Sequence, residues 1–265
     1  MLQDLVFYLA GGAAAGVLAG LFGVGGGTIL VPLMLLLLGH SGAPEQHWMH
    51  IAVGTSLAVI VVNSISSIRA HHRRGAVRWD IVARLAPGVM IGALTGAWVA
   101  DQLTSRTLGL IFAVFLLLVG LQLLTARQPR PSRGLPGAWG MAGAGGGIGI
   151  LSALVGIGGG SLTVPFLAWC NVAMTQAVAT SSAVGLPIAV AGAAGYVLTG
   201  LGDGGLPAWS LGFIYLPAFI GLAVSGMLTA PLGARMAHAL PAKRLKQAFG
   251  AFLLLVSARM FYVML

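Results

Sequence analysis

Two short glycine blocks, each followed by a hydroxyl residue, carry the residue types best suited to bind a ligand in this 265-residue chain. The candidate binding residues are Gly25, Gly26, Gly27 and Thr28 in the first block and Gly158, Gly159, Gly160 and Ser161 in the second. Glycine lets a ligand approach the backbone closely, and the N–H groups at a helix start carry a partial positive charge. Each block therefore predicts a site for a small anion, bound by backbone N–H groups and one hydroxyl.

Two Thr-Ser pairs could supply further hydroxyl donors. They are Thr55 with Ser56 and Thr180 with Ser181, each about two turns into a predicted helix. A hydroxyl inside a helix often bonds to a carbonyl of its own backbone, so packing and ligand binding are equally open for these pairs. The glycine blocks also have a second interpretation, because glycine lets membrane helices pack closely.

The sequence offers no set of side chains that is typical of an enzyme. It contains no Ser–His–Asp pattern, no phosphate-binding loop and no pair of catalytic carboxylates. His40, His47 and His50 fall near one predicted outer loop, and we expect no metal there. We therefore expect no enzymatic activity, no metal site and no cofactor. No acidic residue lies inside a predicted membrane span, so a coupled proton would have to use a histidine or travel on the substrate.

Composition places the chain in a membrane. It is 58% hydrophobic and only 7% charged, with a mean hydropathy of +0.96, whereas soluble domains carry about 25% charged residues. No Asp, Glu, Lys or Arg occurs from Leu5 to Pro44 or from Gly134 to Gly202, and such runs suit spanning helices of roughly 20 residues. A soluble globule, a disordered chain and a disulfide scaffold are excluded. The net charge of +9 comes from short clusters between apolar runs, which favours a topological role over nucleic-acid binding.

The apolar runs predict an all-α polytopic membrane protein with ten helical pieces. The first five pieces are Leu5–Phe22, Thr28–Leu38, Met49–Ile68, Ile81–Ala100 and Leu108–Leu124. The second five are Ala138–Val155, Ser161–Cys170, Gln176–Leu198, Trp209–Leu228 and Leu245–Met264. The pieces after the glycine blocks have only ten or eleven residues, about 15–17 Å at 1.5 Å per residue. Each spans about half of a hydrocarbon core of roughly 30 Å, so each would begin near the middle of the membrane.

Clusters of Lys and Arg predict which loops face the cytoplasm. The basic segments are Arg69–Arg78, a linker over Arg127–Pro136, and Arg235–Lys246. The turns near Asp101–Ser105 and Gly200–Pro207 then face outward, because one predicted span separates each of them from a basic segment. Both chain termini are expected outside by the same count.

The two halves of the chain repeat one another. LFGVGGGTILVP (Leu21–Pro32) and LVGIGGGSLTVP (Leu154–Pro165) share seven of twelve residues, and a later block around FxxFLLLV shares another seven of twelve. Equivalent turns fall on opposite predicted sides, with Asp101–Arg106 outside and the basic Arg235–Lys243 inside. This arrangement predicts two inverted-topology repeats of about five helical segments each, with a Gly-rich break and a short helix in each half.

The expected organisation is a first transmembrane repeat over residues 1–126, a cytoplasmic linker over 127–137 and a second, inverted repeat over 138–265. Inverted repeats are typical of secondary transporters, in which the site lies between the repeats and the repeats rock to alternate access. The alternative is a channel-like anion facilitator or a non-transporting membrane scaffold. Channels usually have rings or several equivalent sites, whereas this chain has one related pair.

Several motifs resemble the sulfite exporter TauE/SafE family of membrane transporters. They are GxGGGxxxVP in both halves, HxAVGTSLA (His50–Ala58), HHRRGAVRW (His71–Trp79), AVATSSAVGLPIAVAGAAGY (Ala177–Tyr196) and LPAWSLGFIYLPA (Leu206–Ala218). The resemblance covers nearly the whole chain. It implies transport of a small sulfur-containing anion, such as sulfite, thiosulfate or an organosulfonate, across the cytoplasmic membrane. The lipid bilayer is the implied surrounding, and coupling to protons and assembly into a homo-oligomer are left open.

Overall fold

The protein is described by a computed structural model that covers residues 2–22, 26–39, 44–125, 134–239 and 242–264. In the first half the elements are α1 (Leu2–Phe22), α2 (Gly27–Leu38), the short 3-10 helix η1 (Glu45–His47), α3 (Trp48–Arg73), α4 (Trp79–Asp101) and α5 (Ser105–Thr125). In the second half they are α6 (Ala138–Val155), α7 (Gly160–Trp169), α8 (Met174–Gly200), β1 (Ser210–Leu211), β2 (Ile214–Tyr215), α9 (Leu216–Ala239) and α10 (Ala242–Met264).

Seven helical segments among the described residues are long and apolar enough to cross a membrane. They lie in α3 with η1, α4, α5, α6, α8, α9 and α10, and shorter apolar stretches lie in α1, α2 and α7. Large apolar side chains such as Trp98, Leu118 and Leu255 are more than half exposed on the outer helix faces. A surface of this kind suits lipid rather than water, so the expected all-α polytopic membrane fold is confirmed.

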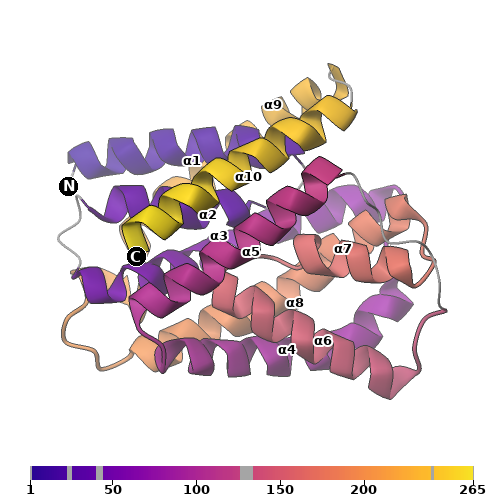
Figure 1. Ribbon diagram of the computed structural model, residues 1–265, viewed down its shortest axis with the longest axis horizontal. Coiled ribbons are helices and arrows are strands. Elements are labelled where there is room, and N and C mark those ends of the chain that lie inside the picture. Colours follow the sequence, from indigo (N-terminus) through magenta and orange to yellow (C-terminus); the bar gives the residue numbers. More distant parts are fainter. Residues whose placement is uncertain (1, 23–25, 40–43, 126–133, 240–241, 265) are drawn as a thin grey trace.

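The helices pack around a central crossing of α3 and α8. Helix α1 lies along α9, α4 lies along α6, and α5 lies along α10 (Figure 1). Glycine allows the closest of these approaches. A Cβ at Gly12 would lie 2.7 Å from the Cα of Leu222, and a Cβ at Gly96 would lie 2.6 Å from the carbonyl oxygen of Ile150. Small residues at helix interfaces are how membrane helices gain packing contact.

The two halves of the chain interleave rather than stand apart. The first helix of each half packs against the fourth helix of the other half, α1 on α9 and α6 on α4. Two related repeats would exchange partners in this way, whereas their inversion across the membrane stays a prediction. Residues 127–133, which are most of the expected linker, lie outside the described residues.

The sequence prediction is wrong for the helix start at Trp209. Residues Ser210–Leu211 and Ile214–Tyr215 form a two-stranded antiparallel hairpin, and α9 begins only at Leu216. Gly212 at the turn has a φ of 54°, which suits glycine. Phe213 is buried, and its N–H donates to the Tyr196 carbonyl oxygen at 3.1 Å. The segment that forms this hairpin is apolar because it packs inside the helix bundle, and not because it is helical.

The expected basic loop Arg235–Lys246 is also largely helical, because α9 extends to Ala239 and α10 begins at Ala242. Both chain ends lie at one end of the bundle (Figure 1). There the Arg106 side chain, at the start of α5, donates through Nε to the Met264 carbonyl oxygen at 2.5 Å. The face of the membrane on which the termini lie stays a prediction.

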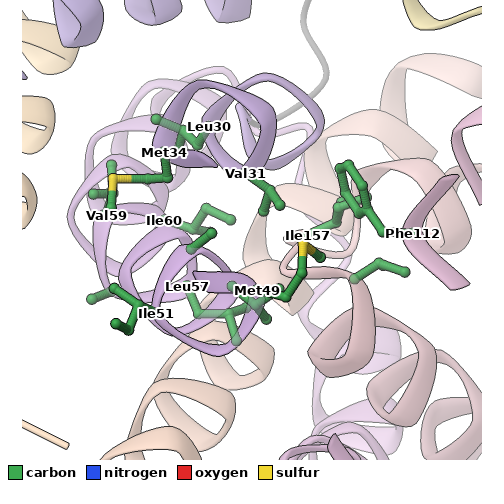
Figure 2. Close-up of a cluster of buried hydrophobic side chains, with 14 of the residues drawn as sticks. Leu30, Val31, Met34, Met49, Ile51, Leu57, Val59, Ile60, Phe112 and Ile157 are labelled. Carbon is green, nitrogen blue, oxygen red and sulfur yellow. The ribbon is translucent and has the colours of Figure 1, made fainter. Parts of the chain in front are cut away.

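One continuous apolar cluster surrounds the glycine-rich segments. Figure 2 shows side chains of α2, α3 and α5 packed against Ile157, which lies in the second glycine block. The labelled members are Leu30, Val31, Met34, Met49, Ile51, Leu57, Val59, Ile60, Phe112 and Ile157. A close-packed apolar shell of this kind excludes water from the polar backbone that it encloses.

Candidate functional site

The short helices α2 and α7 begin at the glycine blocks, as expected from the sequence. Helix α2 has 12 residues and α7 has 10, so each is long enough to span about half of the hydrocarbon core. Gly26 precedes α2 with a φ of 82°, and its carbonyl oxygen accepts the N–H groups of Ile29 and Leu30 at 3.0 and 2.9 Å. Gly159 precedes α7 and accepts the N–H of Thr163 at 2.7 Å. Gly25 lies outside the described residues.

The two glycine blocks meet backbone to backbone inside the bundle. A Cβ at Gly27 would lie 2.5 Å from the carbonyl oxygen of Gly156 and 2.8 Å from the Cα of Ile157. Gly156 itself has a φ of 67° and ends α6. The Ser56 hydroxyl donates to the Gly156 carbonyl oxygen at 2.9 Å and so ties α3 to the second block. The start of α2 and the break before α7 are therefore one structural unit.

Several buried hydroxyls without partners among the described residues occur in the segments next to this unit. Thr28 in the first turn of α2, and Ser161 and Thr163 in the first turns of α7, have hydroxyl oxygens with no hydrogen-bond partner among the described residues. Ser152, in the last turn of α6, is a fourth such residue. An unpaired buried hydroxyl costs free energy, so four near two helix starts indicate groups available to a ligand.

The four hydroxyls of the Thr-Ser pairs are engaged with the protein. Thr55 accepts the N–H of Tyr215 at 3.0 Å, and Thr180 accepts the N–H of Arg78 at 3.1 Å. The Ser181 hydroxyl donates to the carbonyl oxygen of Val178, one turn earlier in its own helix, at 2.8 Å. In the described conformation these hydroxyls form hydrogen bonds with backbone groups. Those of Thr55, Ser56 and Thr180 link separate elements.

The bonds of Thr55 and Thr180 are counterparts of each other. Thr55 in α3 holds the segment that leads into α9, and Thr180 in α8 holds the segment that leads into α4. Since α3 and α4 correspond to α8 and α9 in the sequence repeat, each half anchors the entry to the fourth helix of the other half. The Thr-Ser pairs, which the sequence offered as ligand-binding groups, thus also connect the two halves of the chain.

Sequence reasoning missed Thr163 and Ser152. Both are fully buried, with exposed fractions of 0%. Thr163 aligns with Leu30 in the repeat, so the comparison of the halves directed attention away from it. A signal did exist, because Ser152 is a single hydroxyl in an apolar run close to the second glycine block, and Thr163 lies two residues after the candidate Ser161.

Among the described residues, no group of three His, Cys, Asp or Glu side chains lies close enough to hold a metal ion. The donors around the glycine blocks are hydroxyls and the N–H groups of helix starts, and α2 and α7 contain no charged side chain. Such donors suit a small anion with several acceptor oxygens.

Comparisons with known proteins agree with the fold and the motifs. A probable membrane transporter protein of Haemophilus influenzae is 34% identical over 98% of this chain and 99% of its own length. Another from Methanocaldococcus jannaschii is 28% identical over 89% of this chain and 87% of its own. No solved structure matches the chain. The model of the sulfite exporter TauE/SafE family matches residues 8–260. The chain therefore belongs to the sulfite exporter TauE/SafE family and is a multi-pass membrane transporter.

Proposed function

We propose that the protein is a secondary transporter that moves a small sulfur-containing anion across the cytoplasmic membrane by alternating access. Sulfite, thiosulfate and organosulfonates are the candidate substrates. The anion binds between the start of α2 and the glycine break that precedes α7, between the two halves of the chain. Both termini face outward, and the basic end of α3 faces the cytoplasm.

The observation that carries this proposal is the set of buried hydroxyls at the two helix starts. Thr28, Ser161 and Thr163 have no hydrogen-bond partner among the described residues, although their oxygens are inaccessible to solvent. Leaving such a group unpaired costs about 1–3 kcal/mol. A bound oxyanion would accept hydrogen bonds from these hydroxyls and from N–H groups of the helix starts. Those bonds would offset the cost.

The chemistry of the site favours an oxyanion over other small ligands. The site offers donors and partial positive charge without Lys or Arg, as helix-start anion sites do in other transporters. The family is described as a sulfite exporter family, which supports sulfite as the first compound to test.

Alternating access draws support from the way the halves interlock. The hydrogen bonds of Thr55 and Thr180 tie each half to the segment before the other half's fourth helix. Each bond is a separate contact between the halves, so one can break while the other stays in place. Cysteines introduced at Asp101 and Lys246 should react with an impermeant maleimide from opposite faces of the membrane. Reaction of both from the same face would contradict the inverted repeat.

Counterflow in proteoliposomes tests the proposed function. The purified chain is reconstituted with unlabelled sulfite inside, and uptake of radiolabelled sulfite is followed; thiosulfate, an organosulfonate and sulfate are compared in parallel. A carrier predicts uptake that depends on substrate inside the vesicle, because exchange requires the site to face each side in turn. Uptake that is independent of internal substrate would indicate the channel-like facilitator. No uptake of any of these anions would overturn the proposal.

A further inference from the structure

A second polar site lies away from the glycine blocks, between the starts of η1 and α3, the end of α4 and the α8–β1 loop. It is a hollow of about 390 Å³, which is room for several water molecules. Its lining residues are Gln46, His47, His50, Leu103, Phe213 and the two carboxylates Asp101 and Asp203. The sequence placed these histidines near an outer loop and left open whether a histidine carries a coupled proton.

His50 is the buried group of this hollow, with only 5% of its surface exposed. Its Nε2 lies 2.9 Å from the Ala100 carbonyl oxygen. A carbonyl can only accept, so Nε2 carries a hydrogen, and Nδ1 of the neutral ring presents a lone pair. That Nδ1 is buried and has no hydrogen-bond partner among the described residues. It is therefore an acceptor whose ligand must be a donor or a proton.

The other titratable groups lining the hollow are His47, Asp101 and Asp203. His47 Nε2 lies 3.3 Å from Asp203 Oδ2, and the His47 and His50 ring centres are 6.5 Å apart. Asp101 directly follows Ala100, the partner of His50. Burial of the ring is the largest effect on His50 and opposes a proton there, and a protonated His47 opposes it further. The Ala100 carbonyl oxygen and the Asp101 carboxylate favour the proton.

The hollow is physically linked to Thr55, and so to the entry of α9, through the β1–β2 hairpin. The Phe213 ring lies 5.1 Å from the His50 ring, centre to centre. Two residues later, the Tyr215 N–H donates to the Thr55 hydroxyl. Thr55 is five residues after His50 in α3, about 7.5 Å along the helix axis. A change of charge at His50 thus acts directly on the segment that Thr55 anchors.

We propose, on the basis of the proposed transport function, that His50 binds the proton that is coupled to anion transport. A proton from the aqueous hollow bonds to the Nδ1 lone pair while Nε2 keeps its bond to Ala100, and it leaves by the reverse step, so no other bond is broken. The hollow lined by His47, Asp101 and Asp203 is its route from solvent, and the hairpin around Phe213 transmits the charge to the joint at Thr55.

The variant His50→Gln tests this role. The glutamine amide can still donate to the Ala100 carbonyl oxygen, but it has no atom that takes up a proton near neutral pH. In proteoliposomes, we expect sulfite counterflow at equal pH on both sides to stay within about twofold of wild type. Sulfite accumulation driven by an imposed pH gradient should fall at least tenfold. His72→Gln, at the opposite end of α3, is the matched control and should leave both activities unchanged.

The outcomes separate the two proposals. If wild type shows no counterflow, the proposed transport function fails, and the proton site fails with it. If wild type shows counterflow but His50→Gln accumulates sulfite as well as wild type, only the proton site is overturned. A measurement on the wild type covers the case in which the variant does not fold. A pH-sensitive dye trapped in the vesicles should report a proton flux that starts on addition of sulfite, and its absence during net sulfite transport would also overturn the proton site.

Discussion

The two glycine blocks begin helices of similar length but differ in the polar groups that they bring. The start of α2 contributes one hydroxyl without a partner among the described residues, that of Thr28, and the position that corresponds to Thr163 is Leu30. The start of α7 contributes Ser161 and Thr163, and Ser152 lies nearby at the end of α6. The second block is also tied to α3 by Ser56.

This difference teaches that a sequence repeat need not be a repeat of chemistry. The backbone of the two breaks is alike, because both must start a half-length helix near the centre of the bundle. The side chains have diverged, so the bound anion should depend more on α7 than on α2. The first block instead provides close approach, since Gly27 touches the backbone of Gly156 and Ile157.

The largest expected effect comes from removing hydroxyls at α7. The double variant Ser161→Ala with Thr163→Val should raise the sulfite KM of counterflow about a hundredfold, and Thr28→Val should raise it about tenfold. Each lost bond to a charged ligand is worth about 1.5 kcal/mol or more. Thr95→Val is the control, because that hydroxyl is exposed and donates to the Ile91 carbonyl oxygen of its own helix. Equal effects of the α2 and α7 changes would remove the asymmetry.

The next effect separates backbone contact from side-chain contact. A methyl group at Gly27 would meet the backbone of the second block, whereas one at Gly158 would meet Cγ2 of Ile60 at 2.8 Å, a side chain that can shift. Overpacking costs about 1–3 kcal/mol, so Gly27→Ala should lie at the upper end and Gly158→Ala at the lower. Melting temperatures in detergent measure the difference. A larger loss for Gly158→Ala would contradict the assignment of the contact.

The smallest effect concerns the serines of the two Thr-Ser pairs. Ser56→Ala removes a bond between α3 and the second block, whereas Ser181→Ala removes one within α8. A hydrogen bond contributes about 1 kcal/mol, so Ser56→Ala should lower the melting temperature and Ser181→Ala should change it less. If the two variants melt alike, Ser56 does not stabilise the break.

The elements that the sequence predicted well are those whose limits are local. Helix α6 has the expected bounds. Helices α2 and α7 begin at glycine, because the consecutive glycines before them interrupt the helix. The hairpin at Trp209–Tyr215 was mispredicted, since the apolar run of a hairpin buried in a bundle looks the same as that of a helix. Its partners Tyr196 and Thr55 are distant in the chain.

Side-chain roles were harder to predict than helices for the same reason. His50 lies in the first turn of α3, as the predicted helix Met49–Ile68 implied, but its bond to the Ala100 carbonyl oxygen was not predicted. Which face of a helix is buried among other helices depends on packing that an apolar sequence does not display. The ligand-binding role of the glycine blocks stays a prediction, whereas their convergence is a feature of the fold.

The central claim is that the hydroxyls beside the glycine blocks bind the anion, and sulfite-dependent thermal stability tests it most directly. A ligand that binds the folded protein raises its melting temperature in proportion to the logarithm of ligand concentration over Kd. We predict that sulfite stabilises wild type and Thr95→Val equally, and that Thr163→Val needs about ten times more sulfite for the same shift. An identical sulfite response in Thr163→Val and wild type would contradict the claim.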